Sequence, residues 1–86
     1  MEIEHIRIEI DTVDHEIITL LARRKTLIKM IGEIKKRNNL PVHDKLREEK
    51  LLKRLLELAE KQSLDKKYIE RIYQIILKES KKTQTG

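Results

Sequence analysis

The feature that most constrains this chain is a regular apolar seam along its first 34 residues. Apolar residues recur there in alternating steps of three and four, the heptad spacing of a helix that packs along its length. The series is Ile3, Ile6, Ile10, Val13, Ile17, Leu20, Leu27, Ile31 and Ile34, and its missing member is Arg24. The seam predicts one helix from about Ile3 to Asn38. This helix ends before Pro41, because proline disfavours helix in the residue that precedes it.

Two shorter helices are predicted in the rest of the chain. Asp44 is a good N-cap for the second helix, which ends near Gln62 and Ser63. The third starts around Asp65, runs toward Ser80 or Gln84, and leaves Thr85 and Gly86 frayed. The expected apolar faces are Leu51, Leu52, Leu55, Leu58 and Ala59 on the second helix, and Ile69, Ile72, Tyr73, Ile76 and Leu77 on the third. The chain therefore reads as all-α, with three helices in one domain spanning residues 1–86.

The first predicted helix is too long for the other two to cover. A helix of about 36 residues is roughly 54 Å long, whereas a compact chain of 86 residues has a radius of gyration of about 12 Å. We expect a second copy to cover the exposed seam, most simply in a two-fold dimer with antiparallel long helices. The alternative is a long helix whose free end extends as a coiled-coil tail.

Composition removes several classes of protein. The chain has no cysteine, which excludes a disulfide scaffold, a thiolate zinc site and a cysteine nucleophile. Two glycines are too few for a phosphate-cradling loop, and no apolar run approaches the ~20 residues of a membrane span. The acidic, amphipathic start at Glu2 to His5 is unlike a signal peptide, so we expect a cytoplasmic protein.

The net charge of +5 suits nucleic acid, a membrane surface or a small acidic substrate. Fifteen acidic residues lie among the 20 basic ones and only two residues are aromatic, which argues against nucleic acid. Membrane binding would need a basic helix with no competing core to build. A basic nucleic-acid-binding dimer stays as an alternative, and it predicts binding that weakens steeply with salt.

Polar residues stand where the apolar stripe of each predicted helix should continue. Arg24 and Lys35 are eleven residues apart, about three turns, so they share nearly one face. The polar residues on the other two stripes are Arg47, Glu48, Ser80 and Gln84. Because buried charges are costly unless paired, this coincidence predicts a cavity for a small polyanion. The alternative is that Arg24 only fixes the register of packed helices and that the other charged residues face solvent. Residue spacing does not favour one of these two interpretations over the other.

Arg7 lies on the flank of the seam, 17 residues before Arg24 and about 26 Å away along a straight helix. It is therefore too far to share a cavity with Arg24 and Lys35 of its own chain. In an antiparallel dimer, Arg7 of one protomer reaches the cavity of its partner, with the two-fold axis near residue 18.

Gly32 costs a helix about 1 kcal/mol relative to alanine. Close approach of another helix or of a ligand would explain it, and a tolerated glycine is the alternative. His5, His15 and His43 lack a metal-binding spacing such as His-Glu-x-x-His. No pairing of a nucleophile with a base is recognisable either, so the predicted site has cations and hydrogen-bond donors but no obvious catalytic base.

The chain resembles the all-helical (AroQ-type) chorismate mutases over its whole length. The resemblance rests on an ordered set of residues at matching spacings: Arg7 with Val13-Asp14, Leu20-Leu21-Ala22-Arg23-Arg24, Gly32-Glu33-Ile34-Lys35, Pro41-Val42-His43-Asp44, Arg47-Glu48, and Ile75-Ile76 through Ser80 to Gln84. It implies an intertwined homodimer with two equivalent sites that converts chorismate to prephenate in aromatic amino-acid biosynthesis, without cofactor or metal.

The same resemblance implies a role for each site residue. The partner's Arg7 and Arg24 would bind the ether-linked carboxylate. Lys35 and Gln84 would donate to the ether oxygen, while Arg23 faces solvent. The remaining residues are assigned to the ring: Arg47 and Ser80 to its carboxylate, and Asp44 and Glu48 to its hydroxyl. Two other functions remain open, an isochorismate pyruvate-lyase on the same scaffold and a non-catalytic regulatory helical dimer.

Overall fold

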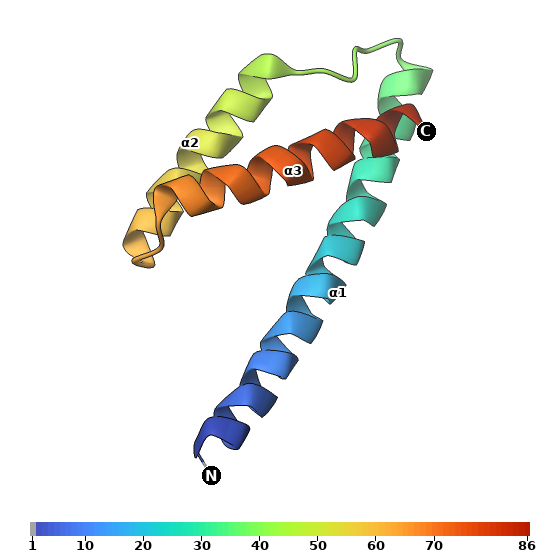
Figure 1. The fold of residues 1–86 in the computed structure, drawn as a ribbon. Coiled ribbons are helices and arrows are strands. Elements are labelled where there is room, and N and C mark those ends of the chain that lie inside the picture. The colour runs from blue at the N-terminus through green and yellow to red at the C-terminus, as the bar shows by residue number, and fades with distance from the viewer. Residues whose placement is uncertain (1) are drawn as a thin grey trace.

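The computed structural model describes residues 2–86, and these form three helices without a strand (Figure 1). They are α1 (Glu2–Arg37), α2 (Lys45–Lys61) and α3 (Lys66–Thr85). The all-α class is confirmed, and the predicted helix boundaries are correct to within two residues, except that α3 continues five residues beyond Ser80, the earlier of its two predicted ends. The expected fraying is wrong at Thr85, which is helical and whose Oγ1 donates to the carbonyl oxygen of Lys81 at 3.2 Å. Met1, the first residue of the predicted domain 1–86, lies outside the described residues.

The connections are shaped by polar caps at one end of a helix and left-handed residues at the other. Asp44 is the N-cap of α2, as predicted, because its side chain accepts the Arg47 N–H at 3.0 Å. Asn39 follows α1 with a φ of 53°. The Leu40 N–H then returns to the carbonyl oxygen of Lys35 at 2.8 Å, as in a Schellman motif. The chain therefore leaves α1 through its left-handed Asn39, two residues before Pro41.

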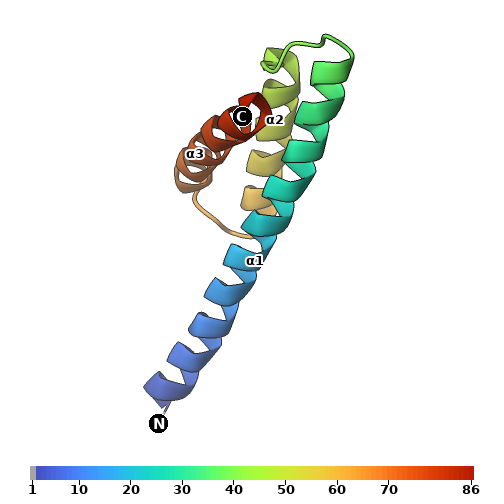
Figure 2. The ribbon, with the colours of Figure 1, turned by 90° about the vertical axis from the view of Figure 1, so that its right-hand side faces the viewer.

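The third helix joins the other two (Figures 1 and 2). It packs against both α1 and α2, while α1 and α2 do not contact each other. It crosses the C-terminal half of α1, and the N-terminal half of α1 extends away from the rest of the molecule. The molecule measures 57 × 24 × 15 Å with a radius of gyration of 16.1 Å. It is thus much more extended than the ~12 Å expected of a compact chain of this length.

The single chain has almost no buried core. Among the described residues, Ala59 is the only buried hydrophobic residue, and no large side chain is fully enclosed. The predicted stripe of α3 is half-buried, as are Leu51, Leu52 and Leu55 of α2. The prediction for Leu58 is wrong in the isolated chain, where it is 52% exposed because α3 packs on the adjacent face of α2. Of the described helices, none is both long and apolar enough to cross a membrane.

The crossing of α1 and α3 depends on Gly32, which is buried. A Cβ at this position would lie 2.9 Å from the Cα of Gln84 and 3.1 Å from its carbonyl oxygen. Only a residue without a side chain allows this approach of the two backbones. Of the two explanations for Gly32, the close approach of another helix is confirmed.

Candidate active site

A cavity of about 200 Å³ lies where the last turns of α3 face α1, the connection after α1 and the start of α2. Seven of the eight residues predicted for the site line it: Arg24, Lys35, Asp44, Arg47, Glu48, Ser80 and Gln84. All three helices contribute, so residues as far apart as 24 and 84 meet at one place. The isolated helices could not form this site, because no helix carries more than three of these residues.

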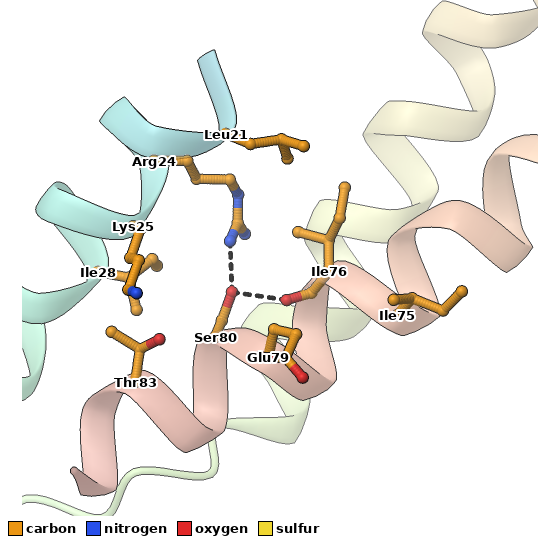
Figure 3. A pocket seen from close by; sticks show the side chains of 9 residues that line it. All are labelled: Leu21, Arg24, Lys25, Ile28, Ile75, Ile76, Glu79, Ser80 and Thr83. Atoms are coloured by element: carbon orange, nitrogen blue, oxygen red, sulfur yellow. Dashed lines mark hydrogen bonds between the residues drawn. The ribbon is translucent and has the colours of Figure 1, made fainter. Parts of the chain in front are cut away.

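Arg24 is held by α3. Its side chain is half-buried, and its Nη1 donates to the Oγ of Ser80. Ser80 is buried and donates in turn to the carbonyl oxygen of Ile76 at 2.8 Å (Figure 3). A guanidinium has five N–H donors in a rigid fork, so this contact orients Arg24 and leaves other donors for a carboxylate.

Lys35 and Gln84 form the second polar pair of the cavity. The Nζ of Lys35 donates to the Oε1 of Gln84 at 2.8 Å and to the carbonyl oxygen of Val42 at 3.0 Å. An ammonium has three N–H donors, and the amide of Gln84 still has its NH₂ group. Two positioned N–H donors thus remain side by side. Because Gly32 admits the backbone of Gln84 so closely, the packing of the two helices decides where these donors lie.

The acidic residues and Arg47 line the side of the cavity that faces α2. Asp44 and Arg47 are exposed, and one carboxylate oxygen of Asp44 is used to cap α2. Glu48 is more enclosed, with 27% of its side chain exposed. Its Oε1 lies 3.0 Å from the Nζ of Lys81, and its Oε2 lies 3.7 Å from the Nε2 of His43.

The cavity is cationic. It is lined by four basic side chains, Arg24, Lys35, Arg47 and Lys81, and two acidic ones, Asp44 and Glu48, which leaves a formal charge of +2. Apolar side chains complete its wall, namely Ile28, Ile31, Val42, Leu51 and Leu77. This combination suits a small, partly apolar dianion, which the cations attract and the apolar wall separates from water.

Arg7 is the predicted site residue that the cavity does not include. It is exposed on the projecting half of α1, where its Nη1 lies 2.7 Å from the Oε1 of Glu4. Its place on the helix agrees with the argument that it cannot reach the cavity of its own chain. Arg23 is exposed and does not line the cavity, whereas its neighbour Arg24 does.

Sequence reasoning missed Lys81. It faces the cavity one turn after Leu77 and three residues before Gln84. That spacing was visible in the sequence, but a lysine in a run of charged residues reads as a solvated side chain. Across residues 2–86, no three His, Asp or Glu side chains are grouped as a metal site would require.

A second hollow of about 270 Å³ adjoins the first and shares Arg24, Ile28 and Ser80 with it (Figure 3). Its other walls are largely aliphatic and come from α1 and α3, mainly Leu21, Ile28, Ile75 and Ile76. Leu21 is 41% exposed and Ile75 is 68% exposed. An apolar surface therefore lies open to solvent directly beside the polar groups of the cavity.

Comparison with known proteins gives a consistent result. The family model described as chorismate mutase type II matches residues 6–85. Three relatives bear the name bifunctional chorismate mutase/prephenate dehydratase. The protein from Buchnera aphidicola subsp. Baizongia pistaciae is 49% identical to this chain over 75 residues. The protein from Buchnera aphidicola subsp. Schizaphis graminum is 45% identical over 78 residues. The protein from Escherichia coli K12 is 38% identical over 79 residues. These matches cover 87%, 91% and 92% of this chain but only 20% of each relative, so the chain spans about a fifth of their length.

Proposed function

The chain belongs to the type II chorismate mutase family, and on that premise we propose that it converts chorismate to prephenate, an isomerisation within aromatic amino-acid biosynthesis. The observation that carries the proposal is the pair of N–H donors on Lys35 and Gln84, held beside Arg24 in a cavity of charge +2. Residues 1–86 would act as one catalytic domain, and the cytoplasmic location stays a prediction.

The proposed reaction is an intramolecular Claisen rearrangement, in which one C–O bond breaks as a C–C bond forms. No proton moves and no covalent intermediate is needed, so the protein requires neither a nucleophile nor a general base. Its first contribution is to fold the flexible enolpyruvyl arm over the ring. Arg24, oriented by Ser80, holds the carboxylate of that arm, and Arg47 holds the carboxylate of the ring.

The second contribution is electrostatic. Negative charge grows on the ether oxygen as its bond to the ring breaks. The ammonium of Lys35 and the amide N–H of Gln84 donate to that oxygen. Because both donors are already positioned by their mutual hydrogen bond, they stabilise the transition state more than the ground state. On the opposite side, Asp44 and Glu48 accept the hydrogen bond of the ring hydroxyl.

We also propose that the active protein is an intertwined homodimer. The support is the lack of a core in the single chain, the separation of α1 from α2, and the exposed seam on α1. An antiparallel α1 of a second copy would cover the aliphatic hollow beside Arg24 and bring its Arg7 to the carboxylate that Arg24 binds. This arrangement gives the seam a partner along its whole length.

The activity is tested by mixing purified protein with chorismate, following the loss of its absorbance, and converting the prephenate to phenylpyruvate with acid. Turnover to prephenate is the expected result. A folded protein without turnover contradicts it. Isochorismate, tested alongside, distinguishes the lyase alternative, because release of pyruvate from isochorismate alone would replace the mutase assignment. Absence of turnover with either substrate would favour a regulatory dimer.

The shared site is tested by mixing two inactive variants, Arg7→Ala and Lys35→Ala. In a mixed dimer, one cavity combines Lys35 of the first variant with Arg7 of the second and is complete. Random exchange of chains should then restore about a quarter of the wild-type activity per chain, because half the dimers are mixed and each has one complete site. A mixture as inactive as its components would show that Arg7 does not act across an interface.

A further inference from the structure

Lys81 and Glu48 form an ion pair that differs from three other lysine and arginine pairs within residues 2–86. Their side chains are 39% and 27% exposed, and the Nζ lies 3.0 Å from the Oε1. In the pairs Arg7–Glu4, Lys66–Glu60 and Lys82–Glu79, more than half of each side chain is exposed. Exposed pairs contribute little because water screens them, whereas a partly enclosed pair is screened less. The Lys81–Glu48 pair is therefore the one whose geometry the fold maintains best.

The pair also links two helices at the wall of the candidate active site. Lys81 belongs to α3 and Glu48 to the first turn of α2, and both residues line the cavity. A glutamate in a first turn is free to adopt several rotamers when it faces solvent. An ammonium that reaches it from the neighbouring helix restricts that freedom and holds the carboxylate toward the cavity.

The contact leaves Glu48 able to bind a ligand. An ionised carboxylate has about four lone-pair sites on its two oxygens. Lys81 uses one site on Oε1, and His43, at 3.7 Å from Oε2, is beyond hydrogen-bonding distance. Oε2 thus keeps its acceptor sites for a hydroxyl in the cavity. The ammonium of Lys81 is paired with the Glu48 carboxylate, and we expect its effect on a ligand to be exerted through that carboxylate.

We propose that Lys81 is a positioning residue that holds Glu48 in place to accept the ring hydroxyl of the substrate. This inference rests on the proposed function. A hydrogen bond to the hydroxyl is present in both the ground state and the transition state, because that group does not react. Loss of the bond therefore raises KM and leaves kcat nearly unchanged.

The experiment compares Lys81→Met, Glu48→Gln and their combination with the wild type, using Lys82→Met as a matched control. Lys82 is the next residue on α3 and pairs with Glu79 outside the cavity. Lys81→Met should raise KM about tenfold, as expected for one hydrogen bond to a charged group, with kcat within about twofold. Lys81→Arg should restore most of the loss, and Lys82→Met should behave as wild type.

The double variant, Lys81→Met with Glu48→Gln, shows whether Lys81 acts on the substrate through Glu48 or directly. If it acts through Glu48, Lys81→Met should change KM by less than about twofold in a Glu48→Gln background. A full tenfold effect in that background would mean that Lys81 contacts the substrate itself, which overturns the proposal. A fall in kcat without a change in KM would also overturn it, since that is the result of losing folded protein.

Thermal unfolding of the same four proteins gives a readout that does not depend on activity. The proposal expects the decrease in Tm of the combined variant to be smaller than the sum of the two single decreases, because the second substitution breaks no further contact. Additive decreases would show that the ion pair does not form and would overturn the proposal whatever the kinetics. A wild type without chorismate turnover would remove the proposed function, while the unfolding comparison would still report on the pair.

Discussion

The two halves of α1 carry the same apolar seam but lie in different surroundings. In the N-terminal half, Ile3, Ile10 and Ile17 are 65%, 51% and 48% exposed, and this half of the helix extends away from α2 and α3 (Figure 1). The C-terminal half faces α3 through Arg24, half-buried Ile28 and the buried Gly32. One continuous helix is thus integrated into the fold at one end and unpacked at the other.

The C-terminal half shows that the exposed seam is not simply an unfinished contact with α3. Leu27, Ile31 and Ile34 belong to the seam, yet they remain 49%, 43% and 45% exposed although α3 packs on this half. The face that meets α3 also includes Ile28 and Gly32, and it overlaps the seam at the position of Arg24. Thus α1 covers only part of its apolar surface with its own chain, and most of the seam stays exposed. Solvent exposure of so many large aliphatic side chains is costly, which supports the proposed homodimer.

The largest expected loss of activity comes from a substitution in the C-terminal half of α1, which packs against α3. Lys35→Ala removes an N–H donor aimed at the ether oxygen and should lower kcat by two to three orders of magnitude, about the loss seen when one oxyanion-hole donor is removed. Steady-state turnover of chorismate measures it. Lys36→Ala, next in sequence and outside the cavity, should keep wild-type turnover. A Lys35→Ala rate close to wild type would overturn the assignment of the site.

Gln84→Glu tests the same donor pair through pH. A carboxylate does not donate a hydrogen bond, so turnover at pH 7 should fall about a hundredfold. Activity should rise as the pH falls through the pKa of the new acid, ordinarily about 4.3, and the ammonium of Lys35 moves that pKa lower.

The wild type provides the comparison, since Gln84 does not titrate and its rate should be nearly flat around neutrality. Thr85→Glu adds the same charge one residue later and should leave turnover at neutral pH close to wild type. A Gln84→Glu rate that does not depend on pH would contradict contact with the ether oxygen.

Ile10→Lys tests whether the exposed N-terminal half of α1 mediates the proposed dimerisation. A lysine in the seam has to be desolvated when the second copy packs, so the variant should be monomeric at micromolar concentration, as measured by light scattering. Turnover should fall by about a hundredfold because the partner's Arg7 is lost.

Thr19→Lys is the matched control, since nine residues on a helix place it on the opposite side of α1 from Ile10. It should remain dimeric and active. A monomeric Ile10→Lys protein with full turnover would show that the packed half is a complete site by itself.

The smallest effect is expected at the crossing of the two helices. Gly32→Ala favours α1 by about 1 kcal/mol in helix propensity, but the new Cβ lies 2.9 Å from the Cα of Gln84. The last turn of α3 must shift, so we expect kcat to fall roughly tenfold while Tm changes little. Glu33→Ala, at the next position on α1, places an alanine outside the cavity without adding a Cβ at the crossing and should be neutral. An unchanged kcat in Gly32→Ala would show that the position of Gln84 tolerates this shift.

The local elements could be predicted from the sequence because their causes are local. The heptad seam specifies α1, and the carboxylates of Asp44 and Asp65 cap α2 and α3. Polar residues interrupting apolar stripes indicated six residues of the cavity, and the family resemblance added Asp44. The end of α1 was placed correctly for an incomplete reason. Pro41 was expected to stop the helix, but the left-handed Asn39 does so first. That conformation is accessible to asparagine, yet sequence alone does not require it.

Other features depended on how the helices come together. The sequence predicts a solvated Lys81, whereas the packing of α3 against α2 pairs it with Glu48. The sequence predicts that Leu58 is buried, whereas it is exposed because α3 packs on the neighbouring face of α2. The sequence left open why a glycine stands at position 32, and the close approach of the Gln84 backbone explains it. For Lys81 and Gly32 the answer lies in a contact between residues more than 30 positions apart in the sequence.

The sequence by itself determined that this protein is three helices, that one of them is too long for the others to cover, and that cations stand on its inward faces. These properties follow from periodicity, capping and charge, which act over a few residues. The tertiary structure decided which donors are paired, with Lys35 on Gln84 and Arg24 on Ser80, and which faces remain open. Hydrogen bonds and close backbone approach act over about 3 Å, so they are set only when helices distant in sequence have packed.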